Sequence, residues 1–256
     1  STTAIQSVEQ ALRFLLETGF DFAEFTVGLA MNPPEDDLAA LVGVVETVGL
    51  PVPAFNSFVP RHLPIVGPSR DLAALKEYVQ EACVRMNQLG GEIVVLGSGA
   101  ARRVPAGYAR EAAQAELVEF LGLAADAATD FGITVVVEPL NKAETNLIHT
   151  VDEAVALAAE TGKPNVRALA DTYHMEKEME SVAVLRRLGA FLAHVHVADT
   201  DRRAPGTGTC DYRQLRSCLE AGGYTGRISV ECSWTDFEVE APATLATLRA
   251  AWSERQ

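Results

Sequence analysis

Four segments of the sequence end in a side chain that could bind a metal ion or move a proton. Apolar runs directly precede Glu138, Asp171 and Glu231, and His196 lies near the end of the run AHVHVA. A charge at the end of a buried strand costs free energy unless something compensates it. The pattern therefore predicts that these four side chains converge on one divalent metal ion.

The residue types narrow the choice of metal. Three carboxylates and one imidazole are a donor set typical of Mn²⁺, Mg²⁺ or Co²⁺, whereas Zn²⁺ in structural sites prefers Cys and His. We expect Mn²⁺, with Zn²⁺ kept as an alternative. His194 precedes His196 by two residues, so both imidazoles should face the same side of a strand. We expect His196, nearer the strand end, to be the ligand and His194 to lie one layer deeper, supporting it or packing.

Strand and helix candidates alternate along the chain, which predicts a parallel sheet with crossover helices. The strand candidates are residues 22–27, 52–58, 92–98, 134–141, 166–172, 193–199 and 227–233. A doubly wound open sheet and a closed (β/α)₈ TIM barrel both satisfy this alternation. The barrel is favoured because it points successive strand ends at a common centre, where the active sites of such barrels lie.

The start of the chain departs from the barrel pattern. The first predicted element is a helix, which the capping pattern S-V-E-Q places from Ser7 and which Gly19 should end. The first barrel strand is therefore missing from this sequence, and we expect a gap or a substitute at its position. No linker or change of composition divides the chain, so we predict one domain over residues 1–256.

Composition excludes several classes of partner. The formal net charge is −14, which argues against nucleic acid and anionic membranes, because both carry phosphate charge. No apolar run approaches the roughly 20 residues of a membrane span, and no signal peptide is visible. The four cysteines form no C-x-x-C pair, which is typical of a protein from a reducing compartment. We expect a cytoplasmic protein that acts on a small molecule.

Three segments carry a resemblance to a known family. VVVEPLNKAETNLIHTVDEA, KPNVRALADTYHME and HVHVADTDRRAPGTG resemble the sugar isomerase/epimerase superfamily with the xylose-isomerase-like TIM barrel, and within it the ketose 3-epimerases of the tagatose/psicose type. The resemblance implies a metal site formed by a Glu, an Asp, a His and a Glu. These fall on the four residues already chosen, Glu138, Asp171, His196 and Glu231.

The resemblance also implies residues that bind the substrate. The family uses a Glu six residues after the first ligand, a His three residues after the Asp, and an Arg after the strand with the metal-binding His. These match Glu144, His174 and Arg202. By analogy with the family, a homo-oligomer is also possible. His62 lies in a long loop after the second strand candidate, where it could line the pocket or face solvent, and we favour solvent.

The residue types fit the chemistry of a sugar epimerase. Epimerisation beside a ketone removes and returns a weakly acidic proton, for which a divalent metal ion supplies a Lewis acid. Two carboxylates on opposite faces of the substrate can act as base and acid. We expect Glu138 and Glu231 to be this catalytic pair as well as metal ligands, with Asp171 and His196 as ligands only.

Other functions remain on the same scaffold. An aldose–ketose isomerase or an inosose-type dehydratase would start with a similar proton abstraction, and a non-catalytic sugar-binding barrel would need no catalysis. An endonuclease of this superfamily would use more His ligands, a tri-zinc site and a basic surface. The acidic charge and the five histidines count against the endonuclease.

Overall fold

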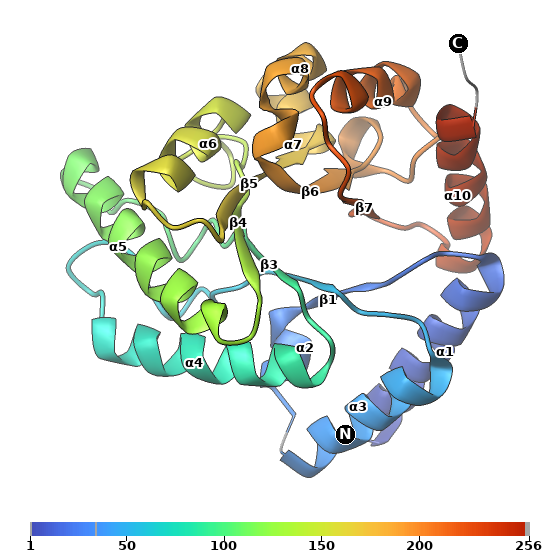
Figure 1. Cartoon of the computed structure of the whole chain (residues 1–256), viewed down its shortest axis with the longest axis horizontal. Coiled ribbons are helices and arrows are strands. Elements are labelled where there is room, and N and C mark those ends of the chain that lie inside the picture. Colours follow the sequence, from blue (N-terminus) through green and yellow to red (C-terminus); the bar gives the residue numbers. More distant parts are fainter. Residues whose placement is uncertain (1, 34, 254–256) are drawn as a thin grey trace.

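The computed structural model describes residues 2–33 and 35–253, and its strands form one parallel sheet in sequence order (Figure 1). The strands are β1 (Glu24–Thr26), β2 (Ala54–Asn56), β3 (Ile93–Leu96), β4 (Thr134–Val137), β5 (Val166–Asp171), β6 (Leu192–Val197) and β7 (Arg227–Val230). Every neighbouring pair is parallel. The sheet curves into a nearly closed barrel, so the predicted TIM-barrel fold with one strand missing is confirmed.

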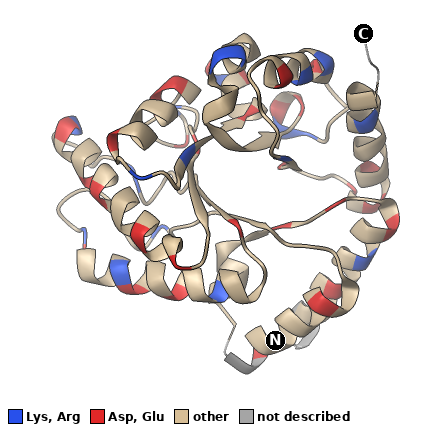
Figure 2. Cartoon of the chain, viewed as in Figure 1, with Lys and Arg blue, Asp and Glu red and all other residues tan. Residues whose placement is uncertain are grey.

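Helices surround the strands on the outside of the barrel (Figure 1). They are α1 (Thr2–Thr18), α2 (Val27–Met31), α3 (Glu35–Val48), α4 (Leu72–Gln88), α5 (Arg110–Thr129), α6 (Val151–Glu160), α7 (Thr172–Lys177), α8 (Leu185–Leu188), α9 (Tyr212–Ala221) and α10 (Phe237–Ser253), with 3₁₀ turns at Val182–Val184, Gly189–Phe191 and Thr200–Arg202. Figure 2 shows acidic and basic residues along these outer helices. Among the described helices, none is long and apolar enough to cross a membrane.

The first helix begins earlier than its capping pattern indicates. Helix α1 starts at Thr2, so the prediction that it begins at Ser7 is wrong. Ala4, Ile5 and Gln6 are compatible with a helix, and extending an existing helix costs less than starting a new one. The predicted end is confirmed. The N–H of Gly19, at φ 98°, bonds to the carbonyl of Leu15 as a glycine cap does.

Alternate strand residues point into the barrel and build it in layers. Ala54, Ile93, Val95, Val136 and Leu169 form a buried apolar cluster of their own inside the barrel. Side chains two residues apart on a strand face the same way. The residues that follow Val136 and Leu169 on this inner face are Glu138 and Asp171. The apolar layer therefore lies beneath a polar layer at the carboxyl ends of the strands.

The barrel is open on one side. Within the described residues, β1 and β7 are the two edges of the sheet and do not pair with each other. A groove of about 630 Å³ lies between them, lined largely by apolar side chains that include Leu15, Phe22, Phe237 and Trp252. The expected gap at the position of the first strand is thus present.

Candidate metal centre

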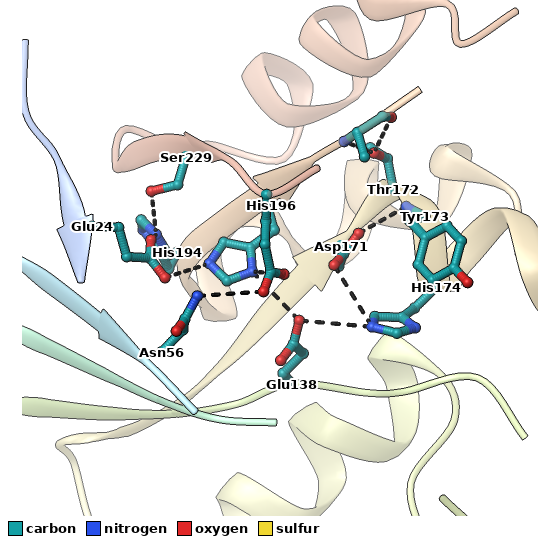
Figure 3. Close-up of polar contacts among 12 residues, drawn as sticks. Glu24, Asn56, Glu138, Asp171, Thr172, Tyr173, His174, His194, His196 and Ser229 are labelled. Carbon is teal, nitrogen blue, oxygen red and sulfur yellow. Dashed lines mark hydrogen bonds and ion pairs between the residues drawn. The ribbon is translucent and has the colours of Figure 1, made fainter. Parts of the chain in front are cut away.

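The four predicted ligands meet at the carboxyl end of the barrel, and Figure 3 shows Glu138, Asp171 and His196 pointing toward one another there. Glu138 directly follows β4, Asp171 is the last residue of β5, His196 lies in β6 and Glu231 directly follows β7. One ligand atom from each side chain lies within 4.8 Å of all the others. Four consecutive strands of the barrel therefore bring together the side chains that the sequence singles out.

The contact distances show how closely these side chains converge. Nδ1 of His196 lies 3.0 Å from Oε2 of Glu231 and 3.4 Å from Oε1 of Glu138. Asp171 and His196 are completely buried, and Glu138 is 5% exposed. Glu231 is the most accessible of the four, with 26% of its side chain exposed. The centre is therefore closed beneath and reached from the side of Glu231.

Several atoms that point into this centre lack a hydrogen-bond partner among the described residues. They are Oε1 of Glu138, Oδ2 of Asp171, Nε2 of His174, Nδ1 of His196 and Oε2 of Glu231. Buried polar atoms nearly always make a hydrogen bond, so a cluster of atoms that make none calls for an explanation. A divalent cation would satisfy the carboxylates and the imidazole lone pair together. The donor set of three oxygens and one nitrogen therefore fits the metal that the sequence predicts.

Asp171 shows how local structure aims one ligand atom. It ends β5 and is also the N-cap of α7, where its Oδ1 accepts a hydrogen bond of 2.7 Å from the N–H of Tyr173. A capping carboxylate of this kind satisfies a free N–H at the start of a helix. The cap fixes the side chain and leaves Oδ2 facing the centre.

The other face of His196 is held by Glu24, a residue that the sequence analysis missed. Oε1 of Glu24 lies 2.9 Å from Nε2 of His196, and Oε2 lies 2.8 Å from Nε2 of His194. His194 is also 3.0 Å from the hydroxyl of Ser229. A carboxylate behind an imidazole places the proton on one ring nitrogen and frees the other to bind a metal. Nδ1 is therefore the nitrogen of His196 that faces the centre.

His194 occupies the deeper position that the sequence predicts. Both imidazoles are fully buried, and their ring centroids are 5.1 Å apart. Glu24, His194 and His196 could also be taken for a second group of metal ligands. Their nitrogens and oxygens already lie at hydrogen-bond distance from one another, so we interpret them as the support of the first group.

The electrostatics of the carboxylates reflect their crowding. Burial raises the pKa of Glu138 and raises that of Asp171 well above its usual value, and the nearby Glu231 adds to both effects. Burial acts on Glu231 as well, but His196 and Arg202 outweigh it and lower the pKa of this residue. Carboxylates this close together repel one another when all are ionised. A cation between them removes that conflict.

Two residues that follow β3 in the sequence, Gly97 and Arg102, constrain the position of Glu138. A Cβ atom on Gly97 would lie 2.2 Å from Oε2 of Glu138, so any larger residue there would displace the carboxylate from this position. Arg102 is completely buried and donates from Nη2 to the carbonyl of Glu138 at 2.5 Å. Burial lowers the pKa of Arg102 to about 10, which leaves the guanidinium charged. This charge lies near Glu138 and favours its ionised form.

The three residues expected to bind substrate lie around the same centre. Nη2 of Arg202 is 3.1 Å from Oε2 of Glu231, and its Nη1 is 3.6 Å from Oε1 of Glu144. Nε2 of His174 is 3.8 Å from Asp171 and 4.0 Å from Glu138. The structure thus brings all seven predicted residues into one site, although their roles stay predictions.

His174 has a defined tautomer. The backbone N–H of Asn141 donates to Nδ1 of His174 at 3.2 Å, and the Asn141 amide lies 2.9 Å from the same atom. Burial lowers the pKa of His174 to about 3, so the ring is neutral near pH 7. Its single proton is therefore on Nε2, which points toward the carboxylates as a hydrogen-bond donor.

The fold and this group of side chains define a class: a (β/α)₈-type barrel with a candidate divalent-metal centre at the carboxyl ends of its strands. The sequence matches the xylose isomerase-like TIM barrel family over residues 12–255. The chain therefore belongs to this family, as the resemblance of its motifs implies.

Curated relatives are similar to the chain at modest identity. A D-psicose 3-epimerase of Agrobacterium fabrum is 36% identical over 115 residues, which is 44% of this chain and 40% of the relative. An L-ribulose 3-epimerase of Mesorhizobium japonicum is 27% identical over 90% of this chain and 77% of the relative. A 3-dehydro-D-guloside 4-epimerase of Escherichia coli is 28% identical over 88% of this chain and 87% of the relative. These relatives support an enzyme of the isomerase class.

Solved structures agree on the architecture. A 3-keto-D-glucoside 4-epimerase from E. coli superposes with a TM-score of 0.82 at 25% identity, over 95% of this chain and 94% of that one. A D-psicose 3-epimerase crystallised in the presence of D-fructose gives a TM-score of 0.86 at 21% identity, over 96% of this chain and 94% of that one. The second likeness establishes the fold alone.

Proposed function

We propose that this protein is a divalent-metal-dependent epimerase or isomerase of a small sugar, which removes and returns a proton beside the carbonyl of a ketose. The observation that carries the proposal is that ligand atoms of Glu138, Asp171, His196 and Glu231 lie within 4.8 Å of one another and make no hydrogen bond with the described residues. Their three oxygens and one nitrogen suit Mn²⁺, with Mg²⁺, Co²⁺ and Zn²⁺ as alternatives. When bound, such an ion would polarise the substrate carbonyl and make the neighbouring proton more acidic.

Glu138 and Glu231 are the proposed acid and base. Both carboxylates border the same point next to Nδ1 of His196, and their environments differ. Burial raises the pKa of Glu138, whereas His196 and Arg202 lower that of Glu231. Two carboxyl groups whose pKa values are pushed apart are suited to opposite roles in proton transfer. In this assignment Glu231 accepts the proton first and Glu138 donates one to the opposite face.

The remaining predicted residues would bind and orient the sugar. Arg202 lies between Glu231 and Glu144 and stacks over the Tyr173 ring at 4.9 Å, which limits its movement. The Nε2–H of His174 points into the site as a donor for a sugar oxygen. Glu144 accepts from the amide of Asn141 at 3.0 Å and has a second carboxylate oxygen for a sugar hydroxyl.

The names of the relatives support a ketose or keto-sugar as the substrate class, because they include 3-epimerases and a 4-epimerase of sugars. The share of the D-psicose 3-epimerase that this chain covers is only 40%, so the particular sugar is left open. A cytoplasmic location, the single-domain organisation and a homo-oligomeric state stay predictions of the sequence.

The proposal is tested by following deuterium into the substrate. The metal-stripped protein is incubated in heavy water with a panel of ketoses and aldoses, with and without Mn²⁺, and the exchanged carbon is identified by NMR. We expect Mn²⁺ to restore exchange at C3. Exchange at C1 or C2 would identify an aldose–ketose isomerase, and loss of water from the substrate would identify a dehydratase.

Two variants test the carboxylate pair. Glu138→Gln and Glu231→Gln should each reduce exchange by at least about 10²–10⁴-fold, the usual contribution of general acid–base catalysis. Glu77→Gln, at an exposed position on α4, removes the same charge outside the site and serves as the control. Full exchange in either site variant would contradict the assignment. A bound metal without exchange for any sugar would favour a non-catalytic barrel.

A further inference from the structure

A second cavity lies at the carboxyl ends of β1, β2 and β3, beside the candidate metal centre. Its volume is about 570 Å³, and its lining includes Ser57 and Ser98. Ser57 directly follows Asn56, whose amide donates to Oε1 of Glu231 at 3.3 Å. Ser98 directly follows Gly97, which lies against the carboxylate of Glu138. The cavity is therefore one residue away from the metal centre along two neighbouring strands.

The charge of this cavity is opposite to that of the chain. The whole protein contains 35 Asp and Glu against 21 Lys and Arg. The described lining of the cavity contains no carboxylate, but it contains Arg61 and His62 together with the neutral polar side chains of Thr26, Asn32, Ser57, Ser98 and Tyr78. In a protein this acidic, a cavity whose described lining has no carboxylate and contains an arginine creates a local site for negative charge.

Both basic residues are exposed, and neither is paired within the part of the chain that the structure describes. Among the described residues, the structure gives Arg61 and His62 no hydrogen bond and no ion pair. By contrast, nearby Arg102 and Arg103 donate to the carbonyls of Glu138 and Glu144. Because Arg61 is exposed and the described lining holds no carboxylate, its guanidinium is available to an anion from solution. The planar fork of a guanidinium matches carboxylate and phosphate oxygens.

The loop that carries these residues is anchored at both ends. The N–H of Val59 donates to the hydroxyl of Ser98 at 2.8 Å, and the N–H of Ile65 donates to the carbonyl of Ala101 at 2.8 Å. Ser57 has φ 56° and Ser98 has φ 38°, a region that residues other than glycine seldom adopt. Such strained positions persist where the surrounding structure holds them, often beside a ligand site.

We propose that this cavity binds an anionic group at the end of the substrate remote from the reacting carbonyl, so that the substrate is a sugar acid or a sugar phosphate. The inference rests on the proposed function, because it places the carbonyl at the metal centre. Arg61 and His62 bind the anion at the mouth of the cavity. The hydroxyl and amide groups of Ser57, Ser98 and Asn32 face the sugar hydroxyls between the two ends.

The test compares three ketoses that differ only at C6: D-fructose, D-fructose 6-phosphate and D-fructuronate. For each, kcat/KM for deuterium exchange is measured on the Mn²⁺-loaded wild type, Arg61→Gln, His62→Gln and Lys76→Gln. Lys76 is exposed on α4 and outside the lining, so this last variant removes a charge without touching the cavity. A hydrogen bond to a charged group corresponds to a change of about tenfold in kcat/KM.

We expect the wild type to prefer one anionic ketose over D-fructose by about tenfold or more. Arg61→Gln should reduce the ratio of kcat/KM for that anion over D-fructose by a similar factor, with a smaller reduction for His62→Gln and none for Lys76→Gln. Preference for the phosphate or for the carboxylate identifies the source of the charge. A wild type that prefers D-fructose, or an unchanged ratio in Arg61→Gln, would overturn the inference while leaving the epimerase proposal intact.

A binding measurement separates this inference from the proposed function. Binding of inorganic phosphate to the wild type and to Arg61→Gln is followed by ³¹P NMR line broadening. If no ketose exchanges deuterium, the proposed function fails. Phosphate binding that Arg61→Gln weakens about tenfold would then still support the anion site, and equal binding to both proteins would overturn it.

Discussion

The two sides of the barrel contribute differently to the site. Strands β4 to β7 supply all four candidate metal ligands and lead into the loops and the helix that carry Glu144, His174 and Arg202. Strands β1 to β3 supply no ligand, but Glu24 and Asn56 hold two ligands in place, and the loops that follow these strands line the second cavity. We therefore propose a division of roles: one side performs the chemistry, and the other positions its groups and recognises the far end of the substrate.

The side with the ligands should respond most strongly to mutation. Asp171→Asn removes a fully buried candidate ligand while keeping an oxygen that can cap α7. We expect its Mn²⁺ affinity, measured by electron paramagnetic resonance, to fall by more than about a hundredfold, since changes behind a ligand alone cost about 10–100-fold. Asp126→Asn, at an exposed ion pair with Lys163, should leave the affinity unchanged. Unaltered Mn²⁺ binding by Asp171→Asn would place the metal elsewhere.

A single methyl group on β3 should disturb the ligand on β4. Gly97→Ala places a Cβ atom 2.2 Å from Oε2 of Glu138, so the carboxylate must move. A displacement near 1 Å costs about 10²-fold in rate, and we expect exchange activity to fall by that order. Gly122→Ala is the matched control, because nothing lies within 4 Å of the added atom in α5. Its stability should increase by up to about 1 kcal/mol. Normal activity in Gly97→Ala would show that the position of Glu138 is unimportant.

Glu24 tests whether β1 acts through the metal ligands. Glu24→Gln leaves the side-chain length intact but weakens the hydrogen bonds that fix the tautomer of His196. Mn²⁺ affinity should fall by about 10–100-fold, as for other carboxylates behind a metal-binding imidazole. Asp21→Asn is the control: it removes the same charge at an exposed position nearby and should leave the Mn²⁺ affinity unchanged. Equal affinity in both variants would assign Glu24 a purely structural role, which a thermal unfolding curve would then reveal.

Asn56 should give the smallest effect. Asn56→Ala removes the hydrogen bond of 3.3 Å from its amide to Oε1 of Glu231. Because the acceptor is a carboxylate, we expect kcat/KM for exchange to decrease by about tenfold, with metal affinity less affected. Asn87→Ala, exposed at the end of α4, provides the control. An increase in activity in Asn56→Ala would mean that the contact restrains Glu231 unfavourably.

The same two sides differ in how well the sequence predicts them. The strand order, the seven strands and the convergence of the four ligand candidates follow from buried runs that end in a charge, a pattern that each segment carries by itself. His194 could be placed because it shares a strand face with His196. The start of α1 could not be placed from the sequence, because a capping pattern inside a helix resembles one at the beginning of a helix.

The supporting residues were missed for a physical reason. Glu24 lies within the strand candidate FAEFTV. A carboxylate inside a buried strand indicates a polar partner, as a buried histidine such as His194 does. The partners of Glu24 are some 170 positions away in sequence, so no local pattern identifies them. His62 is exposed, as expected, and yet it lines the second cavity. That cavity is formed by separate loops whose positions depend on tertiary packing, so no local pattern indicates it.

The most direct test of the central claim is the position of the metal. A crystal soaked in Mn²⁺ is measured near the manganese absorption edge, and the anomalous difference map locates the ion. We predict one strong peak about 2.0–2.3 Å from Oε1 of Glu138, Oδ2 of Asp171, Nδ1 of His196 and Oε2 of Glu231. A peak between Glu24 and His194, or none at the carboxyl ends of β4 to β7, would contradict the account.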